Sequence, residues 1–162
     1  MVLGLSLSAF TILHVAISLV AIAAGYIVVC ELLNSKRLGF WNTLFLATTV
    51  LTTVTGFMFP NLTLTPAVIT GIISSIVLLV ALYAFYARHM SGGWRTTYIV
   101  TALIALWLNS FVLVVQTFQK VAFVRALAPT QSEPPFLVAQ VALLILVIVL
   151  GFLAVRRYRP AL

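Results

Sequence analysis

The chain has 162 residues, of which 64% are hydrophobic and only 7% are charged, and its formal net charge is +7 at pH 7. Soluble domains carry roughly 25% charged residues, so this composition excludes a soluble globular protein and indicates a single integral membrane domain over residues 1–162. The basic residues flank apolar runs and form no patch with interleaved aromatic side chains, which argues against nucleic acid as a partner.

Five apolar runs predict an all-α fold, a five-helix transmembrane bundle with helices at about residues 8–33, 40–59, 66–87, 97–118 and 135–155 and an outer-side loop at 119–134. Each run reaches the ~20 residues that an α-helix needs to cross ~30 Å of hydrocarbon. The first run has no basic residue before Lys36, so it is predicted to be a true spanning helix and not a cleavable signal peptide.

The basic residues alternate between the two sides of this predicted bundle. With the first loop, the third loop and the C-terminal tail placed in the cytoplasm, seven of the nine basic residues lie inside, and Lys120 and Arg125 lie outside. The positive-inside rule therefore predicts an outside N-terminus and a cytoplasmic C-terminus. Glu31 is predicted to form an ion pair with Lys36 and Arg37 at the inner end of the first helix. Four aromatic residues are predicted to form an interfacial belt on the same side: Trp41, Trp94, Tyr98 and Tyr158.

Two of the predicted helices carry a polar or small-residue face. Spacings of three and four residues place a set of side chains on one face of the 97–118 helix: Ala102, Ala105, Asn109, Val112, Gln116 and Gln119. The same spacing places a second set on the first helix: Ser8, Thr11, His14, Ser18, Ala21 and Gly25. An unpaired side-chain amide in hydrocarbon costs several kcal/mol, so the first face must turn toward protein, ligand or water.

Placed by depth, the polar side chains gather in the outer half of the membrane, whereas the inner half holds only threonines and Glu31. This asymmetry predicts an outward-facing polar chamber that binds a small amphipathic ligand, such as a quinone or a lipid, or docks an accessory subunit to a larger membrane complex. The predicted ligand-binding residues are His14, Ser18, Thr52, Thr55, Asn109, Gln116 and Gln140. The alternative is that these groups bond to one another between helices, at about 0.6 kcal/mol each.

The sequence contains no recognisable catalytic set, so it predicts a non-catalytic protein. It has no Asp and therefore no Ser-His-Asp triad, and its two carboxylates, Glu31 and Glu133, are predicted to lie on opposite sides of the membrane. His14 is the deep ionisable residue; it would contact a quinone, ligate haem, or serve only as an interhelical hydrogen-bonding group. Alternative functions are a small transporter or oligomeric channel, and a haem-binding redox subunit. The partners predicted are the lipid bilayer, further copies of the chain, or a larger membrane complex.

The segment before the last helix carries a helix-start pattern. Thr130 followed by Glu133 matches a capping box, and Pro134 and Pro135 suit the first turn of a helix. The pattern predicts a rigid helix start, and the alternative is an outward loop that docks a partner.

Two segments, WNTLFLATTVLTTVTGFMFP and FVLVVQTFQK, the latter followed by ALAPTQSEPPF, resemble a family of small, uncharacterised multi-pass membrane proteins of proteobacteria. The likeness extends over most of the chain. It implies a bacterial inner-membrane location and transfers no activity and no site residue.

Overall fold

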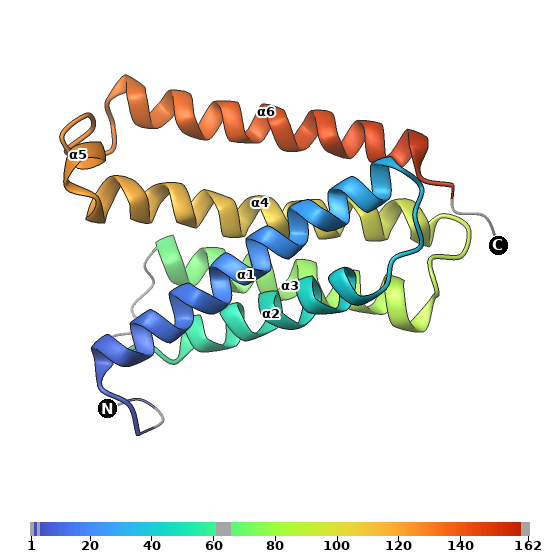
Figure 1. The fold of residues 1–162 in the computed structure, drawn as a ribbon, viewed down its shortest axis with the longest axis horizontal. Helices are drawn as coiled ribbons and strands as arrows, with labels where there is room; N and C mark the ends of the chain where they lie inside the picture. The colour runs from blue at the N-terminus through green and yellow to red at the C-terminus, as the bar shows by residue number, and fades with distance from the viewer. Residues whose placement is uncertain (1, 3, 61–65, 160–162) are drawn as a thin grey trace.

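The computed structural model describes residues 2, 4–60 and 66–159, which form a bundle of long helices (Figure 1). Apart from an isolated β-bridge between Val2 and Leu5, the regular structure in these residues is helical. The helices are α1 (Leu7–Leu33), α2 (Phe40–Phe57), α3 (Pro66–Leu82), a π-helical turn η1 (Tyr83–Ala87), α4 (Trp94–Lys120), the short α5 (Ala122–Arg125) and α6 (Pro134–Arg157).

Four helical segments are long and apolar enough to cross a membrane: Leu7–Leu33, Val68–Ala87, Trp94–Lys120 and Pro134–Arg157. Their length and composition indicate a membrane protein. α2 falls outside this group because six threonines and Asn42 among its 18 residues lower its mean hydropathy.

The predicted helices lie close to their observed positions, with ends displaced by up to three residues. The largest displacement is at α4, which begins at Trp94 instead of residue 97 and ends at Lys120 instead of residue 118. α2 ends at Phe57, before the predicted residue 59, because the Met58 N–H bonds to the Thr55 carbonyl and closes a tighter turn. α3 reaches its predicted end at residue 87 only through η1, in which the Arg88 N–H donates to the Tyr83 carbonyl at 3.0 Å.

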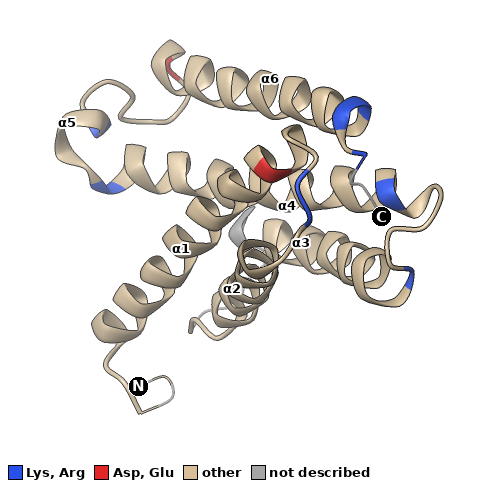
Figure 2. Cartoon of the chain, turned by 45° about the vertical axis from the view of Figure 1, so that its right-hand side comes forward, with Lys and Arg blue, Asp and Glu red and all other residues tan. Residues whose placement is uncertain are grey.

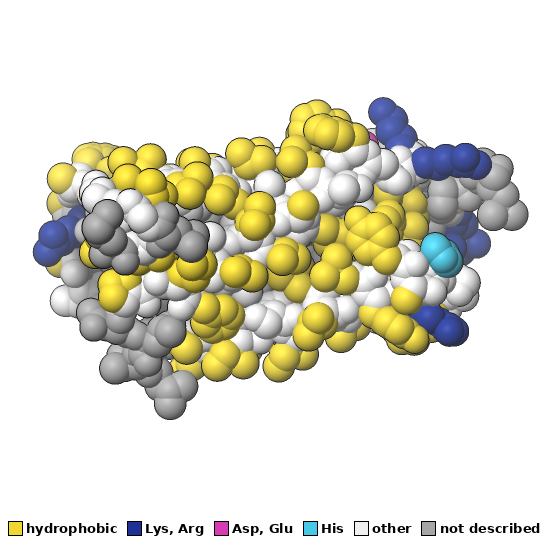
Figure 3. Space-filling view, turned by 90° about the horizontal axis from the view of Figure 1, so that it is seen from below, with side chains coloured by type: hydrophobic (Ala, Val, Ile, Leu, Met, Phe, Trp, Pro, Cys, Tyr) yellow, Lys and Arg dark blue, Asp and Glu magenta, His cyan; other side chains and the backbone are white. Residues whose placement is uncertain are grey.

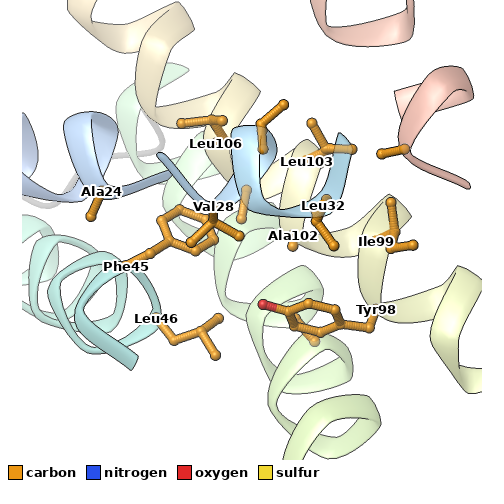
Figure 4. Packing of buried hydrophobic residues seen from close by; sticks show 14 of the residues in the cluster. Ala24, Val28, Leu32, Phe45, Leu46, Tyr98, Ile99, Ala102, Leu103 and Leu106 are labelled. Carbon is orange, nitrogen blue, oxygen red and sulfur yellow. The ribbon is translucent and has the colours of Figure 1, made fainter. Parts of the chain in front are cut away.

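α4 is the central helix of the bundle. It packs against α1, α3 and α6, whereas α1 makes its most extensive contact with α2 (Figure 1). Side chains of three helices meet in the core, as Figure 4 shows: Ala24, Val28 and Leu32 from α1, Phe45 and Leu46 from α2, and Tyr98, Ile99, Ala102, Leu103 and Leu106 from α4.

The small-residue face of α1 lets these helices approach closely. A Cβ atom at Gly25 would lie 2.7 Å from Leu106 Cδ1 and 3.0 Å from the Phe45 ring. Ala21, one turn earlier on the same face, is fully buried. The predicted face is therefore a helix-packing surface at its inner end, as small residues in membrane helices commonly are.

Charged residues occupy the two ends of the bundle (Figure 2), and large apolar side chains cover the surface between them (Figure 3). α6 is the most exposed of the four candidate spans, with 11% of its most apolar window buried against 44% for α4. An apolar surface of this extent suits lipid and not water, in agreement with the membrane character predicted from composition.

The predicted aromatic belt is wrong for two of its four residues. Tyr98 and Tyr158 are 0% and 1% exposed, so they lie inside the bundle and not at its lipid-facing rim. Trp41 is exposed and Trp94 is half-buried, as an interfacial position allows. Tyr98 turns inward because its hydroxyl donates to Asn42 of α2, as described below.

Candidate functional site

A hydrogen bond joins α1 to α2 in the part of the bundle predicted to face outward. His14 Nδ1 lies 2.7 Å from Thr55 Oγ1, and the same hydroxyl lies 2.7 Å from the Leu51 carbonyl. A hydroxyl has one hydrogen, which the carbonyl can only accept, so Thr55 donates to Leu51 and accepts from an Nδ1–H group of His14. The other ring nitrogen, Nε2, is then an acceptor, and it makes no hydrogen bond to the described residues.

Of the polar groups near His14 and Thr55, one has a hydrogen-bond partner and another has none among the described residues. The Ser18 hydroxyl donates to the His14 carbonyl at 2.7 Å, within its own helix. Phe59 packs edge-on against the His14 ring, with centroids 5.2 Å apart. Thr52 Oγ1 is buried and has no hydrogen-bond partner in the described part of the chain. Thr52 is therefore a predicted site residue whose hydroxyl is left for a bound molecule or water.

The polar face of α4 turns into the bundle, as predicted. Ala102 and Ala105 on this face are buried, and Asn109 and Gln116 are half-buried. Asn109 Nδ2 and Gln116 Oε1 are enclosed and lack a partner among the described residues. Gln119, at the end of the face, is exposed and donates to Gln131 Oε1 at 3.3 Å.

Gln140 reaches across from α6 to α4. Its Nε2 donates to the Phe111 carbonyl at 3.3 Å, while its Oε1 is buried without a partner in the described residues. Trp107 Nε1, one turn from Phe111 on α4, is likewise buried and unpaired there. The half of the bundle around α4 and α6 thus holds free donors and free acceptors at the same time.

Within the described residues, hydrogen bonds connect some of the seven predicted residues to one another and not others. His14, Ser18 and Thr55 form one group on α1 and α2, and Gln140 contacts α4. No hydrogen bond joins His14 to Asn109 or Gln116 within the described residues.

Two open hollows in the surface lie elsewhere. One, of about 320 Å³, lies at the outer loop and is lined by Phe118, Gln119, Arg125, Pro129, Thr130 and Gln131. The other, of about 390 Å³, is an apolar groove between α4 and α6. None of the seven predicted residues lines either of them.

The loop before α6 uses the capping residues differently from the prediction. α6 begins at Pro134 with Glu133 as its N-cap, so Thr130 lies before the helix and does not cap it. The Thr130 N–H and hydroxyl both donate to the Glu133 carboxylate, at 3.1 and 2.8 Å. Gln131, with φ of 60°, donates from Nε2 to the Val115 carbonyl and ties the loop to α4. The result is a closed loop that precedes the helix.

The Glu133 carboxylate is the charged centre of that loop. Partial desolvation acts to raise the pKa of Glu133, but hydrogen bonds from the Thr130 hydroxyl and from backbone N–H groups of Thr130 and Ser132 outweigh it. The pKa therefore lies below its ordinary value of 4.5, and the carboxylate is charged at neutral pH.

A second polar cluster, which the sequence did not predict, lies at the opposite end of the bundle. Asn42 of α2 is fully buried and accepts a hydrogen bond from the Tyr98 hydroxyl of α4, while its Nδ2 has no partner in the described residues. Burial raises the pKa of the nearby Tyr158 phenol, and the negative charge of Glu31 adds to that rise. The one feature of the sequence that could have indicated this cluster is Asn42, a side-chain amide in the first turn of an apolar run.

Glu31 also departs from its predicted role. It was expected to pair with Lys36 and Arg37, but its Oε2 atom is buried without a hydrogen-bond partner in the part of the chain that the structure describes. Arg95 Nε is buried in the same way. Two charged groups at this end thus turn atoms inward, away from water.

The chain matches no protein-family model, no curated protein and no solved structure. No set of three His, Cys, Asp or Glu side chains among the described residues could hold a metal ion. The chemistry of the polar groups is therefore the evidence on which a function rests.

Proposed function

We propose that this chain is a non-catalytic, multi-pass protein of a bacterial inner membrane that binds a small amphipathic ligand of the quinone or lipid class in its outer half. The observation that carries the proposal is the set of enclosed amide atoms on Asn109, Gln116 and Gln140 that have no partner among the described residues. Leaving such atoms unpaired costs about 1–3 kcal/mol each, so a bound molecule that pairs with them gains that energy.

The proposed topology has five spans, an outside N-terminus and a cytoplasmic C-terminus. α2 would be the fifth span, about 27 Å long at 1.5 Å per residue. Its threonines suit hydrocarbon because Thr48, Thr49 and Thr53 each donate to a carbonyl four residues earlier, at 2.6 to 3.0 Å. The excess of basic residues at the end that holds the α6 C-terminus supports the orientation.

The free atoms indicate what the ligand would carry. Asn109 Nδ2 is a donor, whereas Gln116 Oε1 and Gln140 Oε1 are acceptors. His14 Nε2 is a further acceptor in the tautomer that Thr55 requires. Hydroxyl groups, which both donate and accept, complement this set, so a quinol or a glycerol-based lipid fits better than an oxidised quinone, which only accepts.

The test compares two glutamines one turn apart on α4. Gln116→Leu removes an unpaired, enclosed carbonyl, whereas the matched control Gln119→Leu removes an exposed amide that bonds to Gln131. Native mass spectrometry of the protein purified in mild detergent would show a small molecule retained by the control and lost from Gln116→Leu and Asn109→Leu.

An opposite result would contradict the proposal. If the unmodified protein retains no small molecule, and Gln116→Leu is simply more stable, the amides are hydrated packing groups. A gain in stability is then expected because leucine suits an apolar interior better than an unpaired amide does.

A further inference from the structure

The apolar groove between α4 and α6 lies outside the proposed ligand site. The two helices run antiparallel side by side (Figure 1), and the groove holds about 390 Å³. Its lining residues are Thr96, Val100, Leu103, Ile104, Trp107, Leu144, Val147, Ile148, Gly151, Phe152 and Val155. The groove shares none of these residues with the predicted polar site.

The groove has the length of one membrane leaflet. Its α4 side runs from Thr96 to Trp107 and its α6 side from Val155 to Leu144, eleven steps from residue to residue along each helix. At 1.5 Å per residue this is about 16 Å, or half of a ~30 Å hydrocarbon core. Trp107 is the midpoint of α4, so the deep end of the groove lies near the centre of the bilayer.

The floor of the groove includes a residue without a side chain. A Cβ atom at Gly151 would lie 3.4 Å from Leu103 Cδ1, in ordinary van der Waals contact, so Gly151 and Leu103 pack together at the floor. The rim is exposed, with Ile148 at 60% and Phe152 at 55%. A flexible chain could lie along the floor between these rim residues.

Positive charge marks the mouth of the groove. The Arg156 guanidinium lies 4.2 Å from the centre of the Phe152 ring, which itself lines the groove. An anionic group would therefore meet the Arg156 guanidinium where the apolar channel reaches the membrane surface.

We infer that the groove holds one acyl chain of an anionic phospholipid, whose phosphate binds Arg156. The groove is as long as one membrane leaflet, which suits an acyl chain, and the positive charge at its mouth favours an anionic headgroup. Guanidinium groups suit phosphate because they offer paired donors in a planar fork. The site would bind a lipid of the leaflet at the basic end of the bundle.

Trp107 offers a direct reporter of this lipid. In a Trp41→Phe/Trp94→Phe variant, Trp107 is the remaining tryptophan of the three in the chain. The protein is reconstituted in vesicles of phosphatidylcholine and phosphatidylglycerol, with bromine atoms near the chain ends of one lipid or the other. We expect brominated phosphatidylglycerol to quench Trp107 more than its mole fraction predicts, and brominated phosphatidylcholine to show no such excess.

Two arginines at the same end of the bundle distinguish a headgroup site from general surface charge. Arg156→Gln should lower the preference for phosphatidylglycerol by about fivefold, the effect of one basic residue near the surface. Arg88→Gln is the matched control, because Arg88 also lies over an aromatic ring, but that ring, Trp94, does not line the groove, whereas Phe152 does. Arg88→Gln should leave the preference unchanged.

A filling variant tests the acyl chain itself. Ile148→Phe adds volume from the exposed rim, and Gly151→Leu adds it from the floor; both should remove the excess quenching while the helical circular dichroism is kept. Ile148→Phe keeps the test decisive if Gly151→Leu does not fold.

Three results would each overturn the inference. They are equal quenching by both lipids, an equal effect of Arg88→Gln and Arg156→Gln, and quenching by neither lipid because a second copy of the chain covers the groove. The Gln116→Leu variant should leave quenching intact, which separates this site from the proposed function.

Discussion

His14 and Thr55 connect α1 to α2 through a relay in which the imidazole donates to a hydroxyl that donates in turn to the Leu51 carbonyl. Both contacts are 2.7 Å long. The relay fixes the tautomer of His14 and leaves Nε2 as its acceptor nitrogen. An isolated histidine in a membrane helix is thus given a defined hydrogen-bonding role by a threonine 41 residues later in the sequence.

Thr55→Val should weaken the α1–α2 contact. The substitution keeps the shape of the side chain but leaves the His14 N–H without its acceptor, so we expect a loss of about 1 kcal/mol in the free energy of unfolding. Thr48→Val is the control, because the Thr48 hydroxyl bonds only to carbonyls of its own helix. Unfolding in mixed micelles measures both variants, and equal effects would show that His14 gains nothing from Thr55.

Tyr98→Phe should destabilise the protein by about 1–3 kcal/mol. The variant removes the donor to Asn42 Oδ1, and Asn42 is fully buried with its Nδ2 already unpaired in the described residues. Tyr26→Phe is the comparison, since the Tyr26 hydroxyl lies a long 3.5 Å from Ser110 in a half-buried position and should cost little. A neutral result for Tyr98→Phe would mean that water replaces the phenol.

Gly25→Ala should cost about 1–3 kcal/mol through overpacking. The added methyl group would meet Leu106 Cδ1 at 2.7 Å and the Phe45 ring at 3.0 Å, and only the leucine can turn aside easily. Gly56→Ala is the contrasting change, because its nearest neighbour, His14 Cε1, lies 3.8 Å away. That variant should be neutral or slightly stabilising, since alanine favours the helix. If both variants lose a similar free energy of unfolding, the close contact of Gly25 with Leu106 and Phe45 is not the cause of the loss.

The outer loop should open as the solution becomes acidic. The pKa of Glu133 is lower in the closed loop than its ordinary value of 4.5, so the carboxylate stabilises closure fully above that value. The stabilisation is lost as the pH falls through the lower, closed-loop pKa, where protonation breaks the bonds from Thr130. Amide hydrogen exchange of Thr130 and Ser132 against pH measures this, and Glu133→Gln should remove the pH dependence. A slope that survives in Glu133→Gln would assign the effect to another group.

Residue spacing predicted the helical character and most helix ends, because apolar runs of fixed length leave few alternatives in hydrocarbon. It also predicted that Asn109 and Gln116 turn inward. It could not predict how helices pair, and so it missed that Tyr98 meets Asn42 across 56 positions. From sequence alone, an aromatic residue near a membrane boundary is predicted to lie at the interface, because its hydrogen-bond partner inside the bundle is not known.

The hydrogen bonds between the predicted site residues could not be predicted from the sequence. Spacing predicted which face of the first helix carries His14, whereas the bond from His14 to Thr55 depends on the relative rotation of α1 and α2. Thr130 and Glu133 do bond, as a capping box would have them, but Gln131 adopts a left-handed conformation and closes the loop before the helix begins. The sequence pattern predicts that Thr130 and Glu133 interact, whereas the backbone conformation of the loop determines that they do so before the helix and not in its first turn.

The central position of α4 has a consequence for the order of assembly. α1 and α2 contact each other directly and can associate as soon as both have been synthesised, and α3 and α4 can follow in the same way. α6 rests on α4 and on the end of α1, and the preceding loop holds it there through Gln131. Because α6 leaves the ribosome after α1 to α4, it docks onto a surface that these earlier helices have formed, so truncation before residue 134 should leave a folded core that exposes one face of α4.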